Sequence, residues 1–224
     1  MMASSIWKNR VAWLRRAATV SALLLALAGV PRSVAADRLI LAPTGSIVHP
    51  GDLKAEHLFG ADGEYVGWLN VGLPMQDMGV EVQAEWSRLG RETRETFGAQ
   101  YSVISEGFTN NLAPSISVGV RDLPNRGPDG RAFFLALTKT FGLSVTQERV
   151  LRNWKLSLGV GSHRMGGLYA GIQGKFRPGF AAQAEYAYRR WSAAVSWPLL
   201  GPLAARASAI DGTAFYGVVL TVSK

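Results

Sequence analysis

Apolar and polar residues alternate with a period of two along most of this chain after residue 36. Residues 80–87 read Val-Glu-Val-Gln-Ala-Glu-Trp-Ser, and similar runs occupy residues 96–103, 115–121, 154–161 and 180–188. A period of two places successive side chains on opposite faces of a β-strand. We therefore predict an all-β fold for everything that follows the first 36 residues.

The length and spacing of these runs favour a membrane barrel. Each run has roughly 8 to 12 residues, which suits a tilted strand crossing a bilayer core of about 30 Å and exceeds the usual ~5 to 6 residues of a soluble strand. Turn signals such as Asn110-Asn111 and Asp211-Gly212 separate the runs. The pattern predicts a single antiparallel transmembrane β-barrel of about 12 strands, with ten as the alternative and the stretch around residues 142–153 as a loop.

The first 36 residues have the features of a cleaved signal peptide. A basic stretch precedes a 14-residue apolar run at residues 17–30, which is short for a membrane-spanning helix. Small residues then lead to the expected cleavage after Ala36, with cleavage after Ala35 as the second choice and an uncleaved anchor as the alternative. The predicted organisation is a signal peptide over residues 1–36 and a barrel over residues 37–224.

The charge of the chain argues against nucleic acid as a partner. Five of the 24 basic residues precede Asp37, and no acidic residue does. From Asp37 onward 19 basic side chains face 16 acidic ones, so the high isoelectric point comes largely from the leader. The chain has no cysteine, which excludes disulfides and thiolate metal sites.

No catalytic or metal-binding motif is found. The three histidines, His49, His57 and His163, are dispersed in the sequence and form no known metal motif. Ser162 and His163 are adjacent, so on a strand they would point to opposite faces and could not act as a nucleophile and its base. We expect no enzyme, no cofactor and no metal.

The apolar face of the predicted strands is interpreted as the lipid face. Its polar counterpart is mostly Ser, Thr, Gln and Gly, whereas the surface of a soluble sandwich would be rich in Lys and Glu. Aromatic residues cluster towards strand ends, as in the girdles of membrane barrels. The predicted lipid-interface aromatics are Tyr65, Trp86, Tyr101, Trp154, Tyr188, Trp191, Trp197 and Tyr216.

The polar face would then line a lumen with charged walls. The predicted lumen-lining charges are Glu81, Glu85, Arg121, Lys155, Lys175, Arg190 and Arg206. The two glutamates share one strand and the basic residues come from later strands, so an acidic wall would oppose a basic wall across a small aqueous pore. The alternative is that these groups pair with each other and fill the interior, as in small closed barrels.

The segment after the leader carries a resemblance to a known family. Pro43-Thr44-Gly45 and the Pro50-Gly51 turn stand before the first clear strand. Residues 39–56 resemble the opening of the YjbH-like envelope barrels. That resemblance implies an outer-membrane location and a part in exopolysaccharide export or retention, without assigning any residue a role. On physical grounds the two prolines also suit a periplasmic lead-in or an early turn.

The sequence thus predicts an outer-membrane β-barrel that is a small passive pore or an accessory of polysaccharide export. A non-conducting structural barrel is the alternative, and a soluble periplasmic β-sandwich is the third possibility. The expected partners are the lipid bilayer of the outer membrane, the barrel-assembly machinery and polysaccharide.

Overall fold

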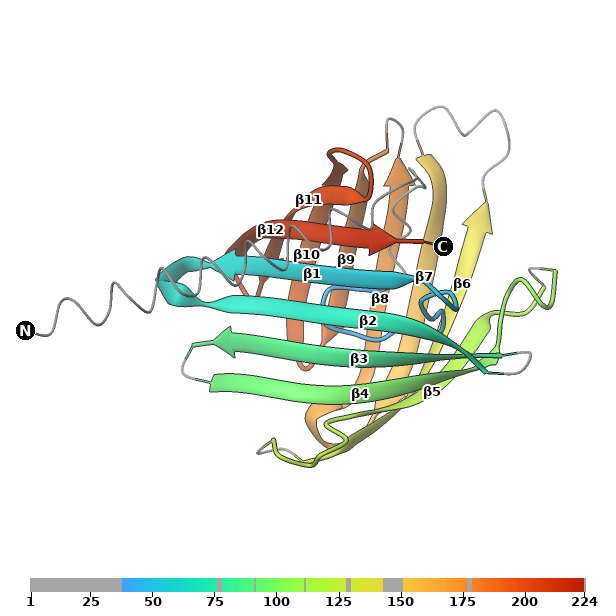
Figure 1. Cartoon of the computed structure of the whole chain (residues 1–224), viewed down its shortest axis with the longest axis horizontal. Coiled ribbons are helices and arrows are strands. Elements are labelled where there is room, and N and C mark those ends of the chain that lie inside the picture. Colours follow the sequence, from blue (N-terminus) through green and yellow to red (C-terminus); the bar gives the residue numbers. More distant parts are fainter. Residues whose placement is uncertain are drawn as a thin grey trace, which may run out of the picture.

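The computed structural model is a closed antiparallel barrel of twelve strands (Figure 1). It describes residues 38–75, 78–90, 92–110, 112–127, 130–142, 151–176 and 179–223. The predicted signal peptide and its cleavage site lie outside these residues. The strands are β1 (Leu53–Gly60), β2 (Tyr65–Met75), β3 (Met78–Leu89), β4 (Glu92–Ile104), β5 (Ser115–Arg121), β6 (Ala132–Gly142), β7 (Leu151–Gly161), β8 (Gly167–Phe176), β9 (Ala181–Ala187), β10 (Arg190–Pro198), β11 (Leu203–Ile210) and β12 (Thr213–Val222).

Each strand pairs with its neighbours in sequence, and β12 returns to β1 to close the sheet. The closing pair aligns Glu56 with Val219. Closure satisfies the backbone groups that an open edge would expose. The predicted barrel of about twelve strands is therefore confirmed. Within the described residues, neither short 3₁₀ turn, Ala61–Gly63 or His163–Met165, provides an apolar helix long enough to cross a membrane.

The two faces of the sheet have opposite polarity, and the apolar face points outward. Phe97 and Leu158 are 56% and 50% exposed on the outside of the barrel. Gln100, Ser117 and Thr138, which point inward, are at most 6% exposed. A soluble sandwich buries its apolar face instead, so this wall has the polarity of a barrel that faces a non-polar surrounding.

Tight turns connect neighbouring strands where the sequence predicts them. Asp211 and Gly212 both have positive φ, as a two-residue hairpin turn between β11 and β12 requires. Tyr188 and Arg189 adopt the same left-handed conformation between β9 and β10, although neither is a residue type that favours it. In the predicted loop near residue 150, β6 ends at Gly142 and β7 begins at Leu151.

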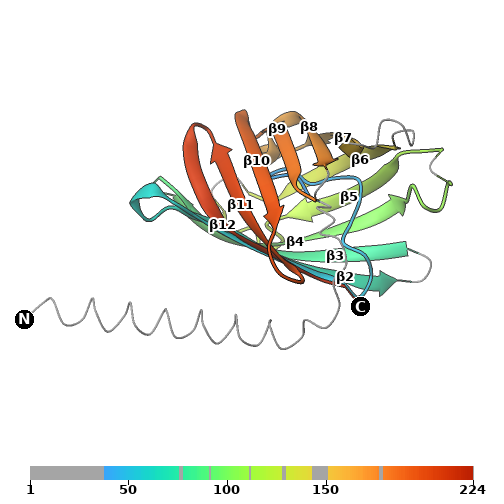
Figure 2. The ribbon, with the colours of Figure 1, turned by 90° about the horizontal axis from the view of Figure 1, so that it is seen from above.

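The barrel has two mouths. We call the one where β1 begins and β12 ends the terminal mouth, and the one with the β9–β10 and β11–β12 turns the opposite mouth. In Figure 2 the segment before β1, drawn in blue, lies between the strands labelled β2 to β4 and those labelled β5 to β9.

Residues 38–48 form a segment inside the barrel, which we call the lumen segment. Its residues are buried except for the half-buried Ser46 and Ile47. The prediction of a periplasmic lead-in is therefore wrong for this segment, although an early turn does follow, with the Asp52 amide donating to the His49 carbonyl at 2.9 Å. Side chains of the lumen wall supply hydrogen-bond partners for several backbone groups of this segment.

Two apolar clusters inside the barrel surround the lumen segment. Leu39 packs with a cluster that includes Phe134 and Tyr169. Ile40 packs with a second cluster that includes Trp68 and Phe215. The interior is thus partly apolar, whereas the sequence pattern indicated a polar lumen throughout.

Candidate functional site

The lumen is the candidate site, and Glu185 is the side chain that binds the lumen segment most directly. Its carboxylate accepts hydrogen bonds from two consecutive backbone amides, those of Leu41 at 2.6 Å and Ala42 at 3.2 Å. Glu185 lies on β9 near the opposite mouth and is 1% exposed. Hydrogen bonds to a charged acceptor are roughly twice as strong as neutral ones, so this carboxylate binds the segment firmly at Leu41 and Ala42.

Uncharged side chains hold the middle of the lumen segment. Gln100 and Ser117 both donate to the Thr44 carbonyl, at 2.5 and 2.9 Å. The Gly45 amide donates to the Thr138 hydroxyl at 2.8 Å. All of these hydrogen bonds are made to the backbone of the segment, whose Leu39 and Ile40 side chains pack in the two apolar clusters.

Two glycines allow the segment and the wall to approach closely. A Cβ on Gly45 would lie 2.2 Å from the Ser115 carbonyl oxygen, and a Cβ on Gly72 would lie 2.2 Å from the His49 carbonyl oxygen. At the terminal mouth the Val48 amide also donates to Glu81 at 2.8 Å. The close packing of the lumen segment against the wall therefore depends on a glycine in the segment, Gly45, and on one in the wall, Gly72.

The structure pairs the buried lumen charges with one another. Glu81, Glu85, Arg121 and Arg206 are all buried and face inward. Arg121 lies 3.5 Å from Glu85, and Arg206 bonds Glu56 at 3.0 Å and Gln183 at 2.6 Å. Each of these two buried arginines thus lies beside a buried carboxylate from another strand.

The other predicted lumen charges lie nearer the ends. Lys155 is half-buried and aligned with the inward-facing Gln173, and Lys175 is half-buried near the terminal mouth. Arg190 lies at the opposite mouth, 3.8 Å from Asp211. The sequence analysis missed Glu185 and Glu56, although both occupy inward positions of alternating strands.

Most of the predicted interface aromatics lie on the outer wall. Trp191 and Tyr216 are 70% and 65% exposed. Near the opposite mouth, Trp86 donates to His57 Nδ1 at 3.0 Å, and Tyr65 stacks on the same imidazole ring. The remaining outward members are Tyr101, Trp154 and Trp197.

Tyr188 departs from the expected placement. Its hydroxyl accepts a hydrogen bond from the buried Arg121 and lies 3.5 Å from the Leu41 carbonyl. The cause is the left-handed backbone at Tyr188, which ends the alternation of β9 and turns the ring into the mouth. Tyr188 therefore belongs to the lumen and not to the lipid interface.

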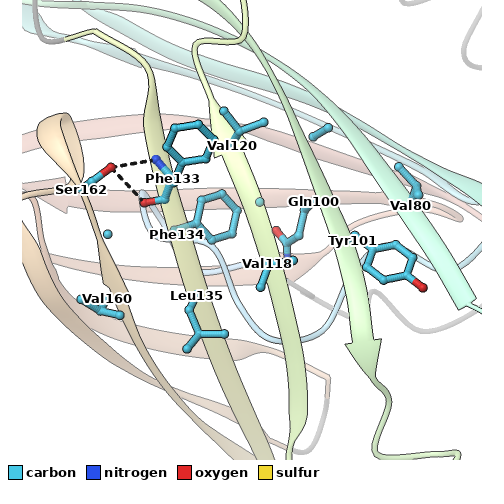
Figure 3. A pocket seen from close by; sticks show the side chains of 13 residues that line it. Val80, Gln100, Tyr101, Val118, Val120, Phe133, Phe134, Leu135, Val160 and Ser162 are labelled. Atoms are coloured by element: carbon cyan, nitrogen blue, oxygen red, sulfur yellow. Dashed lines mark hydrogen bonds between the residues drawn. The ribbon is translucent and has the colours of Figure 1, made fainter.

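Pockets lie on both the outside and the inside of the barrel wall, and they differ in size and lining. On the outside, a pocket of about 730 Å³ is lined mainly by apolar side chains of β3 to β7. Figure 3 shows these side chains and the Ser162 hydroxyl, which is hydrogen-bonded to the backbone of Phe133. Inside, a pocket of about 190 Å³ lies at the opposite mouth. A space of about 10 Å³ lies between Lys54 and Arg206. The lumen segment lies inside the barrel, in contact with side chains of β9, β6 and β3.

The arrangement is a closed twelve-stranded antiparallel barrel whose interior holds a segment of its own chain. Comparison with solved structures finds a KdgM porin in complex with disordered oligogalacturonate, with a TM-score of 0.52 and 12% identity over 77% of this chain and 99% of that chain. A second KdgM porin structure has a TM-score of 0.48, also at 12% identity, and covers the same shares of the two chains. No protein-family model and no curated protein matches the sequence. The first likeness supports the barrel fold alone.

Proposed function

We propose that this protein is an outer-membrane, porin-like β-barrel that the lumen segment holds closed and that conducts small polar solutes when the segment leaves. The observation that carries this proposal is the set of hydrogen bonds between the backbone of the segment and the wall, in which Glu185 and Glu81 accept and Gln100 and Ser117 donate. Because these are hydrogen bonds and not covalent links, water can replace them when the segment moves out.

The outward apolar wall supports the membrane location. An apolar outer band with aromatic residues near both ends is the pattern of outer-membrane barrels. The signal peptide proposed for residues 1–36 would provide the route out of the cytoplasm, and the barrel-assembly machinery would insert the folded strands. The protein has no proposed catalytic role.

Oligosaccharides are the solute class that we propose. The porin of similar fold was solved with oligogalacturonate, and the resemblance of residues 39–56 to the opening of YjbH-like barrels implies a part in exopolysaccharide export. Inward amide and hydroxyl groups such as those of Gln100, Ser117 and Thr138 match the hydrogen-bonding groups of sugars.

A non-conducting structural barrel is the second candidate. The two apolar clusters around Leu39 and Ile40 favour it, because withdrawing each of these side chains into water costs about 1.5 to 3 kcal/mol. Conductance in lipid bilayers distinguishes the two candidates.

The membrane location is tested by Val82→Arg. Val82 is midway along β3 and 39% exposed on the outer wall. An arginine near the bilayer midplane costs about 2 to 4 kcal/mol, so we expect this variant to fail to insert into liposomes, as measured by flotation with the vesicles. The control is Leu200→Arg, in the exposed β10–β11 loop, which should insert normally. Equal insertion of both variants would place the outer wall in water.

The proposed closure of the barrel by the lumen segment is tested by Glu185→Gln. The substitution removes the charge and leaves one carbonyl oxygen for two backbone amides, so at least one charge-assisted bond of about 1.5 to 3 kcal/mol is lost. We expect the fraction of time spent conducting in planar bilayers to rise about ten- to hundredfold. Glu95→Gln, the same change at an exposed position of β4, should leave it unchanged. If neither the wild type nor Glu185→Gln conducts, the result favours the non-conducting structural barrel.

A further inference from the structure

The pocket on the outside of the barrel, which we call the outer pocket, lies where short side chains stand between long ones (Figure 3). Ala99 of β4 and Val120 of β5 are paired in the sheet and half-buried. Tyr101 and Phe133, at two sides of the pocket, are 38% and 58% exposed. The resulting volume of about 730 Å³ lies within the range of about 300 to 1,000 Å³ that is common for ligand pockets.

The outer pocket is part of the wall that we assign to the membrane. Val118, Leu135 and Val160 line it and belong to the outward, apolar face of β5, β6 and β7. Water is not available in the apolar core of a bilayer, and an unfilled pocket would lose packing contacts along its whole lining. The flexible apolar body that a bilayer supplies to such a pocket is the acyl chain of a lipid.

A positive charge lies beyond the end of the pocket nearest the opposite mouth. Arg131 is exposed and directly precedes β6, two residues before Phe133. Its Nη2 atom donates to the Leu123 carbonyl at 2.7 Å, and the Leu123 amide donates to the Phe97 carbonyl at 2.8 Å. These two bonds hold the guanidinium near the exposed aromatic rings of Phe97 and Phe133. Aromatic residues mark the interface depth of membrane barrels, so Arg131 lies at the level of lipid headgroups, where a guanidinium binds phosphate oxygens.

We propose that the outer pocket binds a phospholipid, with one acyl chain lying over Ala99 and Val118 and the phosphate at Arg131. This inference rests on the proposed membrane location and not on conduction, because the pocket and the lumen segment lie on opposite sides of the wall. A second barrel fits the pocket less well. A two-fold axis along the membrane normal would bring the Arg131 side chains of two copies to the same depth at their contact, where like charges repel.

The phosphate contact is tested by native mass spectrometry of the folded protein, released from detergent micelles that contain phosphatidylglycerol or a diacylglycerol with the same acyl chains. We expect the wild type to retain phosphatidylglycerol about two- to fivefold more than diacylglycerol, the size of an exposed ion pair. Arg131→Met should remove this preference. Arg189→Met, in the exposed β9–β10 turn at the same mouth, should keep it.

The acyl-chain contact is tested in the same way with Ala99→Trp, which fills the pocket from the outer side of β4. Losing about ten atom contacts should lower the retention of both lipids about tenfold. Ala193→Trp, the same change at an outward, exposed position of β10, should not change it. The heat-dependent gel shift of a closed barrel shows that both variants fold.

Equal retention in Ala99→Trp and Ala193→Trp, or equal retention of the two lipids by the wild type, would overturn the proposal. A wild-type dimer that Ala99→Trp separates would also overturn it, because a second copy would then occupy the pocket. Flotation of the wild type with vesicles measures the membrane location separately, so a barrel that floats and shows either result lacks only the lipid site.

Discussion

Gly45→Val should open the barrel. A Cβ at this position would lie 2.2 Å from the Ser115 carbonyl oxygen and 2.5 Å from the Thr138 backbone nitrogen. Backbone atoms of two paired strands cannot move aside without breaking the ladder, so the lumen segment itself has to leave. We expect sustained conductance in planar bilayers where the wild-type barrel is closed almost all of the time.

The neighbouring residue provides the control for this prediction. Ser46→Val adds a side chain of the same shape at a half-buried position and should leave the barrel closed. Gly72→Val tests a second close approach, from the β2 side, because its Cβ would lie 2.5 Å from the carbonyl oxygen of Val48 in the lumen segment and 2.2 Å from that of His49. If the Gly45→Val barrel folds but does not conduct, the lumen is closed by something other than this segment.

Arg206→Met should destabilise the barrel by about 3 to 5 kcal/mol, because it leaves a buried carboxylate without its cation. Arg206 and Glu56 are 3.0 Å apart, with side chains only 1% and 5% exposed. The loss is measured as the change in free energy of unfolding by urea in the presence of detergent or lipid.

An exposed ion pair at the mouth provides the matched control. Arg190→Met removes a cation 3.8 Å from Asp211, with both side chains more than 40% exposed, and should cost at most about 1 kcal/mol. Adding Glu56→Gln to Arg206→Met should restore part of the stability, since it removes the stranded charge. A cost for Arg206→Met no larger than that for Arg190→Met would mean that water reaches the pair.

The barrel could be predicted from the sequence because its wall obeys a local rule. Each strand alternates between an outer and an inner environment, so the pattern at residues 80–87 defines both the strand and its faces. The hairpin turn at Asp211-Gly212 is equally local, since both residue types tolerate positive φ. The strand number follows from counting such runs.

The contents of the lumen could not be predicted in the same way. The contacts of Leu41 with Glu185 join residues 144 positions apart, and residues 38–48 carry no periodicity that indicates where they lie. Pro43 and Pro50 suggested a lead-in outside the barrel, and Tyr188 was predicted on the outer wall because a turn conformation is not visible in an alternating pattern. Both errors concern residues whose position depends on the closed barrel and not on local sequence.

The most direct test of closure by the lumen segment is a reversible disulfide between the segment and the barrel wall. A Cβ on Gly171 would lie 2.3 Å from the Leu39 Cδ1 atom, so Leu39→Cys with Gly171→Cys brings two thiols within reach of a disulfide in a chain that has no other cysteine. Combined with Glu185→Gln, this pair should be silent in planar bilayers when oxidised and should conduct after reduction. Equal conductance in the two states, or none in either, would contradict the account of a barrel closed by its own lumen segment.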